Sequence, residues 1–241
     1  MTLLLFQTDS YLREFDATVT AADAETRTLT LDRTAFYPGG GGQPHDMGTI
    51  GSGEHHWPVE RVEKRAGEVV HHVGGDALLP QPGAVVHGTL DWERRYRLMR
   101  THTAMHILCG TIWREFGAQV TGGQMYIDRA RMDFELDDLN LDRVAQIEAR
   151  TNATIAAGAP ITVQILPRAE AFAIPDLIRT KINLLPEGIA EVRVVAVGDY
   201  DTQADGGTHV ADAREVGGIR VIGTRSKGKS NKRLEVALLD D

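Results

Sequence analysis

The sequence predicts an α+β protein in which a β-rich N-terminal part precedes a part that mixes helices and strands. Two observations carry this expectation. Residues 1–90 hold short runs of β-favouring side chains separated by glycine and proline, whereas residues 91–116 contain no proline and a single glycine. Turn-bounded short runs are typical of strands, and a long uninterrupted stretch is typical of a helix. We therefore expect two domains, residues 1–90 and residues 91–241.

Strands are expected in the first part where polar and apolar side chains alternate. Residues 26–32 (Thr-Arg-Thr-Leu-Thr-Leu-Asp) alternate with a period of two, which is the pattern of a half-buried strand. Valine-rich runs follow at 59–62, 69–73 and 85–90. Many short strands at close spacing suggest either a small barrel or a sandwich.

Two helices and four strands are expected in the second part. Asp91 is a good N-cap residue and Gly117 a good C-terminal stop, so the first helix should lie between them. A second helix is expected over 141–157, with apolar residues recurring on one face. The expected strands are residues 161–166, 192–197, 219–223 and 233–239.

The composition of the chain bears on whether it binds nucleic acid or a membrane. The 241 residues are 42% hydrophobic and 25% charged, and the formal net charge is −8. An acidic chain does not indicate DNA binding, and contact with RNA requires a local basic patch. The single cysteine, Cys109, excludes an intrachain disulfide. No segment has transmembrane length and the apolar start is too short for a signal peptide, so we expect a cytoplasmic protein without a membrane partner.

Two pairs of metal-ligand residue types stand far apart in the chain. His102 and His106 are four residues apart in the first expected helix, and Asp205 and His209 are four apart around Gly206 and Gly207. Positions i and i+4 share a helix face, and imidazole and carboxylate both suit zinc. The first spacing alone fits a ligand pair and an incidental histidine pair equally well. It lacks the glutamate of His-Glu-x-x-His, which disfavours a zincin protease.

Five segments of the chain form a set of motifs in a characteristic order. They are the aromatic-proline and glycine-rich run 35–48, the histidine motif 100–108, Arg-Met-Asp-Phe at 131–134, Asp-Gly-Gly-Thr-His-Val at 205–210 and the basic stretch 226–233. In these segments the chain resembles the AlaX proteins, the free-standing relatives of the editing domain of alanyl-tRNA synthetase.

The resemblance implies a fold, a reaction and a partner. It implies an N-terminal small β-barrel of the translation-protein type, followed by an α+β editing domain with a metal-binding helix. The implied reaction is trans-editing: deacylation of mischarged tRNA(Ala), with Ser-tRNA(Ala) as the expected substrate and Gly-tRNA(Ala) as a further one. The implied cofactor is one Zn²⁺ ion held by His102, His106, Asp205 and His209.

One ligand position departs from the related synthetase domain, which carries cysteine where this chain has Asp205. A carboxylate is a harder and less selective ligand than a thiolate, so the identity and the occupancy of the metal stay open. A non-catalytic tRNA-binding module with a degenerate metal site is therefore the alternative function.

Further residues are candidates for substrate and RNA contacts. The resemblance suggests that Thr121 and Gln124 sense the serine hydroxyl, although a plain turn is an equal interpretation. Backbone N–H groups of Gly206, Gly207 and Thr208 could stabilise the reacting ester. The glycine-rich segment 38–42 is either a special turn or a surface for the tRNA end. The expected RNA-binding residues are Arg225, Lys227, Lys229, Lys232 and Arg233.

Overall fold

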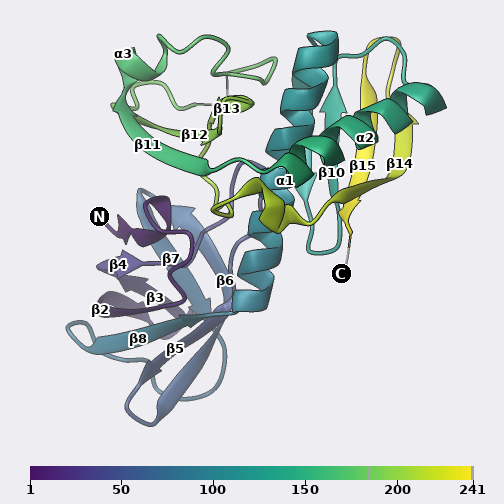
Figure 1. Cartoon of the computed structure of the whole chain (residues 1–241). Helices are drawn as coiled ribbons and strands as arrows, with labels where there is room; N and C mark the ends of the chain where they lie inside the picture. The colour runs from purple at the N-terminus through teal and green to yellow at the C-terminus, as the bar shows by residue number, and fades with distance from the viewer. Residues whose placement is uncertain (184, 240–241) are drawn as a thin grey trace. The chain divides into compact units, whose positions relative to one another are not determined.

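The computed structural model describes residues 1–183 and 185–239, and the chain divides into two compact units, Met1–Arg97 and Leu98–Asp241 (Figure 1). Strands dominate the first unit, whereas the second combines helices with two sheets. The predicted α+β class is confirmed. Within the described ranges, no helix combines the length and the apolar character that crossing a bilayer requires.

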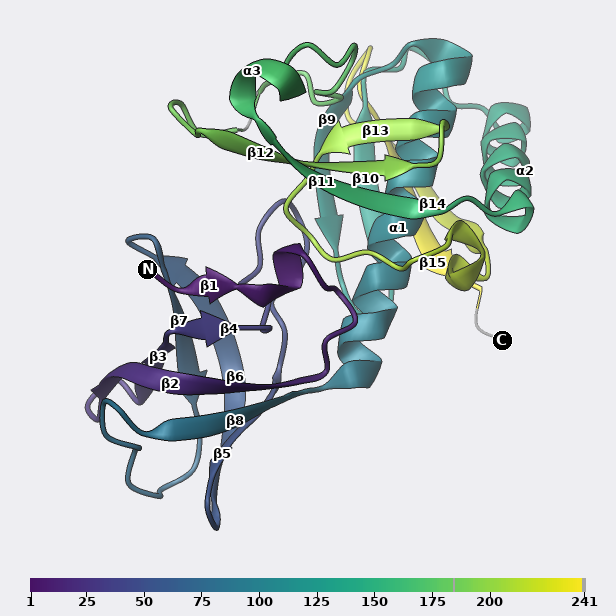
Figure 2. The ribbon, with the colours of Figure 1, turned by 60° about the vertical axis from the view of Figure 1, so that its left-hand side comes forward.

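The first unit is built around a closed barrel of six strands in the order β2-β3-β7-β6-β5-β8 (Figure 2). Every neighbouring pair in it is antiparallel. The strands are β2 (Glu14–Asp23), β3 (Thr28–Leu31), β5 (Gly48–Ser52), β6 (His55–Arg65), β7 (Glu68–Val73) and β8 (Val85–Leu90). Outside the barrel, β1 (Leu3–Leu4) pairs in parallel with β4 (Arg33–Thr34). Of the two expected architectures, the barrel is therefore the one that forms.

Alternating side chains fill the barrel. In β8, the buried residues Val86, Gly88 and Leu90 alternate with exposed ones. The aromatic ring of Trp57 from β6 and the side chains of Leu29 from β3 and Ile50 from β5 are at most 1% exposed and share this core. Strand closure removes free sheet edges and encloses one apolar interior.

The glycine-rich segment forms a tight turn of unusual backbone conformation. Gly39, Gly40, Gly41 and Gly42 have φ angles of 80°, 131°, 57° and 90°. Side-chain-bearing residues rarely adopt such values, so the run requires glycine. Gly40 and Gln43 exchange backbone hydrogen bonds of 3.1 and 2.9 Å. This geometry favours the special-turn interpretation, and a role in binding tRNA stays a prediction.

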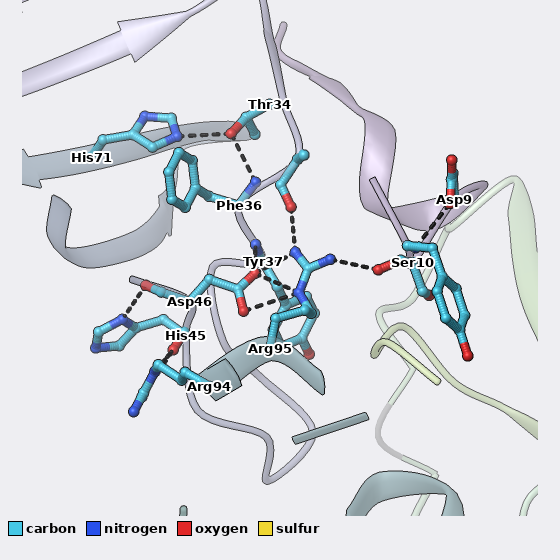
Figure 3. Close-up of polar contacts among 12 residues, drawn as sticks. Asp9, Ser10, Thr34, Phe36, Tyr37, His45, Asp46, His71, Arg94 and Arg95 are labelled. Atoms are coloured by element: carbon cyan, nitrogen blue, oxygen red, sulfur yellow. Dashed lines mark hydrogen bonds and ion pairs between the residues drawn. The ribbon is translucent and has the colours of Figure 1, made fainter. Parts of the chain in front are cut away.

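A buried ion pair fixes the segment that follows these glycines (Figure 3). Arg95 and Asp46 both have fully buried side chains, and Arg95 Nε lies 3.0 Å from each carboxylate oxygen of Asp46. Arg95 also donates to the backbone oxygens of Ser10, at 2.9 Å, and Ala35. Asp46 in turn accepts a 2.6 Å hydrogen bond from the backbone N–H of Tyr37. One guanidinium thus joins three loop segments of the first unit.

The same unit buries a histidine in its neutral form. His71 of β7 is 0% exposed, and its Nδ1 lies 3.1 Å from the Leu29 carbonyl oxygen. That oxygen only accepts, so Nδ1 carries the hydrogen and Nε2 accepts from the Thr34 hydroxyl at 2.9 Å (Figure 3). Burial lowers the pKa of His71 to about 4.

This histidine is expected to make the barrel sensitive to acid. As the pH falls below about 6.5, His71 takes up a proton in the unfolded chain but not in the folded one. The folded state should therefore lose about 3 kcal/mol between pH 6.5 and pH 4, and little more from this group below pH 4. Urea unfolding at pH 7 and pH 4.5 measures the loss, which His71→Gln should largely remove.

The matched control is His87→Gln, because the side chain of His87 is 49% exposed. That variant should keep the pH dependence of the parent protein. Equal pH dependence in the His71→Gln variant and the parent would contradict the assignment.

In the second unit, both predicted helices form. Helix α1 (Trp92–Phe116) begins in the first unit and continues through the second. Its first turn is capped by Asp91, whose Oδ1 accepts from Arg94 N at 3.1 Å, and Gly117 follows its end with φ of 62°. Helix α2 (Leu141–Ala157) starts at the Asn140 cap, which accepts from Arg143 N at 2.9 Å.

Two antiparallel sheets complete the second unit (Figure 1). The first has the order β14-β15-β10-β9 and the second the order β11-β12-β13. Helix α2 lies against β14, where Asn152 exchanges two hydrogen bonds of 2.9 and 2.8 Å with the backbone of Ile219. The elements are β9 (Val120–Met125), β10 (Ala130–Phe134), β11 (Ile161–Pro167), α3 (Arg168–Ala171), β12 (Glu191–Val197), β13 (Asp201–Ala204), η2 (Ala213–Val216), β14 (Ile219–Ser226) and β15 (Lys232–Leu238).

Candidate metal centre

The second unit brings the two distant pairs of metal-ligand residue types together. One ligand atom from each of His102, His106, Asp205 and His209 lies within 4.8 Å of the other three. The three histidines are at most 5% exposed. His102 and His209 stack with ring centroids 4.3 Å apart, and the His106 ring stands edge-on to both. Three imidazoles and one carboxylate therefore converge on one point.

Helix α1 supplies the first pair because its backbone is regular at that point. One helical turn separates His102 from His106, so both rings project from the same face. Thr103, between them, is 0% exposed and contacts His209 Nδ1 through its hydroxyl at 3.2 Å. The helix thus contributes two candidate ligands and a contact that orients a third.

The second pair lies on the segment that follows β13. Arg193 of β12 holds the backbone of Asp205: its carbonyl accepts from Asp205 N at 3.0 Å, and its Nη1 donates to Asp205 O at 2.9 Å. The carboxylate of Asp205 accepts from Gly207 N at 2.8 Å, which closes a tight local turn. His209 Nε2 then lies 2.9 Å from Asp205 Oδ1. The turn therefore places Asp205 and His209 side by side.

The charge states of Asp205 and His209 fit ligation. Burial alone would raise the pKa of Asp205, but the adjacent His102 and His209 hold it well below its ordinary value. Burial, together with the charge of His102, holds the pKa of His209 well below its ordinary value. Asp205 is therefore an anion and His209 a neutral imidazole at neutral pH, which are the forms that bind a metal. Burial alone would lower the pKa of His106, but Asp201 and Asp205 raise it above its ordinary value, which favours the protonated imidazole there.

The donor spacing suits a zinc-sized ion. With bonds of 2.0–2.2 Å, neighbouring donors of a tetrahedral zinc site are about 3.4 Å apart. His102 Nε2 and Asp205 Oδ2 are 3.4 Å apart, and all four donor atoms lie within 4.8 Å of one another. These four residues could hold a metal ion. Cys109 lies outside this group, and burial raises the pKa of its thiol, so it is a core residue rather than a thiolate ligand.

The predicted substrate-binding residues fall into two sets. Next to Asp205, Gly206 is exposed, while Gly207 and Thr208 are buried, and Gly207 N already donates to Asp205. Thr121 and Gln124 lie in β9, where Thr121 donates to Asn231 Oδ1 at 3.2 Å and Gln124 to Met125 O at 3.1 Å. Only Gly206 of the first set therefore has an exposed backbone, and the roles of both sets stay predictions.

The predicted basic patch is largely engaged within the unit. Arg233 Nε and Lys227 Nζ contact the buried carboxylate of Asp133 at 2.6 and 3.1 Å. Lys232 is buried and donates to two backbone oxygens of its own hairpin. Arg225 and Lys229 are exposed. The five basic residues therefore offer less positive charge to an RNA than the sequence suggests, because Asp133 neutralises part of it.

Three residues near the cluster were not among the predicted site residues. Thr103 and Arg193 orient His209 and Asp205, and the buried Asp201 lies 3.4 Å from His106. Asp201 stands four residues before Asp205, the same spacing as in the two candidate ligand pairs, and this signal was not used in the prediction. For Thr103 and Arg193, only the folded arrangement reveals the contact with the cluster.

Two protein-family models match parts of the chain. Residues 7–94 match the family described as tRNA synthetases class II (A), and residues 192–235 match the threonyl and alanyl tRNA synthetase second additional domain. The chain is 39% identical to the alanyl-tRNA editing protein AlaX-M of Methanosarcina acetivorans, over 100% of both chains.

Two other relatives extend the comparison. AlaX-M of Saccharolobus solfataricus is 37% identical, over 97% of this chain and 98% of its own length. An alanine–tRNA ligase of Ignicoccus hospitalis is 37% identical over 92% of this chain, which corresponds to 24% of the ligase. Full-length similarity at this level means that the chain belongs to the AlaX family of alanyl-tRNA editing proteins.

Proposed function

We propose that this protein is a metal-dependent deacylase that hydrolyses the ester of mischarged tRNA(Ala), with Ser-tRNA(Ala) as its main substrate and Gly-tRNA(Ala) as a further one. The observation that carries the proposal is the convergence of His102, His106, Asp205 and His209 in a chain of this family. We further propose that residues 1–90 and 91–241 are the functional domains.

A separate editing site meets a physical need. A pocket that accepts alanine cannot exclude the smaller glycine, and it rejects the added hydroxyl of serine only weakly. Discrimination of this size is roughly 10- to 200-fold, so a second hydrolytic site is required for fidelity. A site that pairs the serine hydroxyl rejects alanine more strongly, because alanine leaves a buried polar group without its hydrogen bond.

The four ligand residues would hold one Zn²⁺ ion. When bound, zinc supplies a Lewis acid beside the aminoacyl ester. The residues of the chain would position the aminoacyl ester next to the ion. Gly206 is exposed beside Asp205, and a methyl group built on it meets nothing within 4 Å, so the chain is open to solvent next to this ligand. Aminoacyl esters are reactive, and correct placement near a few backbone donors accounts for much of the rate of such reactions.

Contact with tRNA is proposed for the β14–β15 hairpin. Arg225 and Lys229 offer exposed charge there, whereas Lys227 and Arg233 would exchange part of their contact with Asp133 for phosphate. Phosphate contacts of this kind give affinity that falls steeply with salt. The proposed RNA contacts therefore rest mainly on two of the five predicted basic residues.

The deciding experiment compares deacylation of Ser-, Gly- and Ala-tRNA(Ala) by the purified protein. Ser-tRNA(Ala) should be hydrolysed fastest and Ala-tRNA(Ala) slowest, a chelator should stop the reaction and added zinc should restore it. A metal-free protein that binds tRNA(Ala) without deacylating it would support the alternative, a non-catalytic tRNA-binding module. Activity that survives complete metal removal would contradict the metal dependence.

Replacing Asp205 with cysteine should keep or tighten zinc binding. A thiolate is a softer ligand than a carboxylate, and the backbone clamp from Arg193 does not depend on the Asp205 side chain. Competition with a chromogenic chelator measures the zinc affinity. The matched variant Asp205→Ala, which keeps the clamp but offers no donor, should bind at least about 10-fold more weakly. Loss of zinc from the Asp205→Cys variant would show that Asp205 has a different role.

A further inference from the structure

A second buried carboxylate lies beside the candidate metal centre. Asp201 is the first residue of β13, and its side chain is 0% exposed. Its Oδ2 lies 3.4 Å from Nδ1 of His106. The group of four mutually close donor atoms among the described residues does not include Asp201. The carboxylate therefore contacts a candidate ligand from behind and is not itself placed as a ligand.

The contact is specific to one nitrogen of His106. Within the described residues, His106 Nδ1 is buried and has no partner that meets hydrogen-bond geometry, and the carboxylate of Asp201 lies 3.4 Å from it. At 3.4 Å the pair is at the long end for a hydrogen bond, and such contacts often tighten when a site is assembled. A hydrogen on Nδ1 would leave the lone pair of His106 on Nε2.

His209 shows the same arrangement at a second ligand. Its Nδ1 contacts the Thr103 hydroxyl at 3.2 Å, and its Nε2 lies on the side of Asp205, at 2.9 Å. His102 also presents Nε2 to Asp205, at 3.4 Å. Two histidines therefore direct Nε2 toward the centre. A hydrogen bond from His106 Nδ1 to the carboxylate of Asp201 would direct the Nε2 of His106 there as well.

Asp201 is itself held in place. Gln203 donates to its Oδ2 at 2.6 Å, and Arg179 Nε lies 3.5 Å from its Oδ1. The guanidinium of Arg179 in turn covers the ring of Trp113, with 4.8 Å to the centroid. A carboxylate that is hydrogen-bonded on one oxygen, with a guanidinium near the other, can restrain the ring that it contacts, which is how residues behind metal ligands act in metalloproteins.

We propose that Asp201 is a positioning residue of the metal centre: it accepts a hydrogen bond from His106 Nδ1–H and thereby directs Nε2 to the ion. The inference rests on the metal site proposed above. The competing explanation is that Asp201 serves only to neutralise Arg179, whose side chain is 10% exposed.

Zinc affinity of the purified protein separates the two explanations. The Asp201→Asn variant should bind zinc about 10- to 100-fold more weakly in chelator competition. The matched control is Asp133→Asn in the same unit. It also removes a buried carboxylate that is paired with an arginine, Arg233, and it should bind zinc like the parent. Equal zinc affinity in the two variants would overturn the role of Asp201.

Nitrogen-15 NMR of the zinc-loaded parent protein gives a test that needs no variant. His106 should carry its hydrogen on Nδ1 and coordinate through Nε2. Coordination through Nδ1 would overturn the inference, even if the Asp201→Asn variant does not fold. If the parent binds no zinc, the metal site and the role of Asp201 both fail. If the parent binds zinc but Asp201→Asn has no effect, only the role of Asp201 fails.

Discussion

Replacing His106 with alanine should lower zinc affinity and slow the deacylation of Ser-tRNA(Ala) together. Four-ligand zinc sites bind with roughly 10–16 kcal/mol, so one ligand accounts for about 3 kcal/mol, or roughly a 100-fold loss of affinity. The variant also leaves Asp201 without the imidazole that it contacts. Zinc affinity by chelator competition and the rate of deacylation at saturating zinc are the two measurements.

The matched control lies on the same helix. Thr111 is 1% exposed and donates to Ile107 O at 2.9 Å, but it is not part of the ligand group. Thr111→Val keeps the volume of the side chain and should leave zinc affinity unchanged. Normal zinc affinity in the His106→Ala variant would remove His106 from the site. Normal affinity with slow deacylation would instead assign it a role in the reaction alone.

Local sequence signals predicted the elements whose determinants are local. The Asp91 cap and the Gly117 stop mark the ends of α1, and α2 was expected with the bounds that it has. The strand β9 was not predicted. It contains Gly122 and Gly123, and it exists because β10 pairs along it, with Gly123 opposite Met132. Pairing between strands depends on residues distant in sequence, which a reading of local patterns does not capture.

In the candidate site, too, the local features were predictable from the sequence, and the contacts between distant segments were not. Spacing of four residues marked each candidate pair, because each pair lies on one local turn of the backbone, and the family resemblance joined the two pairs into one candidate site. The contact between Asp201 and His106, and that between Thr103 and His209, join a helix to segments far along the chain. Likewise, the basic hairpin suggested an RNA surface, but only the fold reveals that Asp133 lies under Lys227 and Arg233.

The second large effect is expected in the barrel unit, where Arg95→Met should destabilise the protein by about 3–5 kcal/mol. The substitution leaves the carboxylate of Asp46 buried without its cation, and breaking a buried ion pair from one side has this cost. It also removes the hydrogen bonds to the carbonyl oxygens of Ser10 and Ala35. Hydrogen exchange of β3 amides, read alongside urea unfolding, assigns the loss to this unit.

Two further variants test the mechanism of that loss. Arg33→Met breaks an exposed pair with Asp32, in which the arginine side chain is 49% exposed, and should cost less than about 1 kcal/mol. The double variant Asp46→Leu with Arg95→Met removes both charges and should be more stable than Arg95→Met alone, because no unpaired charge stays buried. If the double variant is less stable than Arg95→Met, the segment around Asp46 is held by the hydrogen bonds of the Asp46 carboxylate and not by its pairing with the charge of Arg95. The Tyr37 N–H to Asp46 bond of 2.6 Å would then be the main contact, since the double variant removes it and Arg95→Met does not.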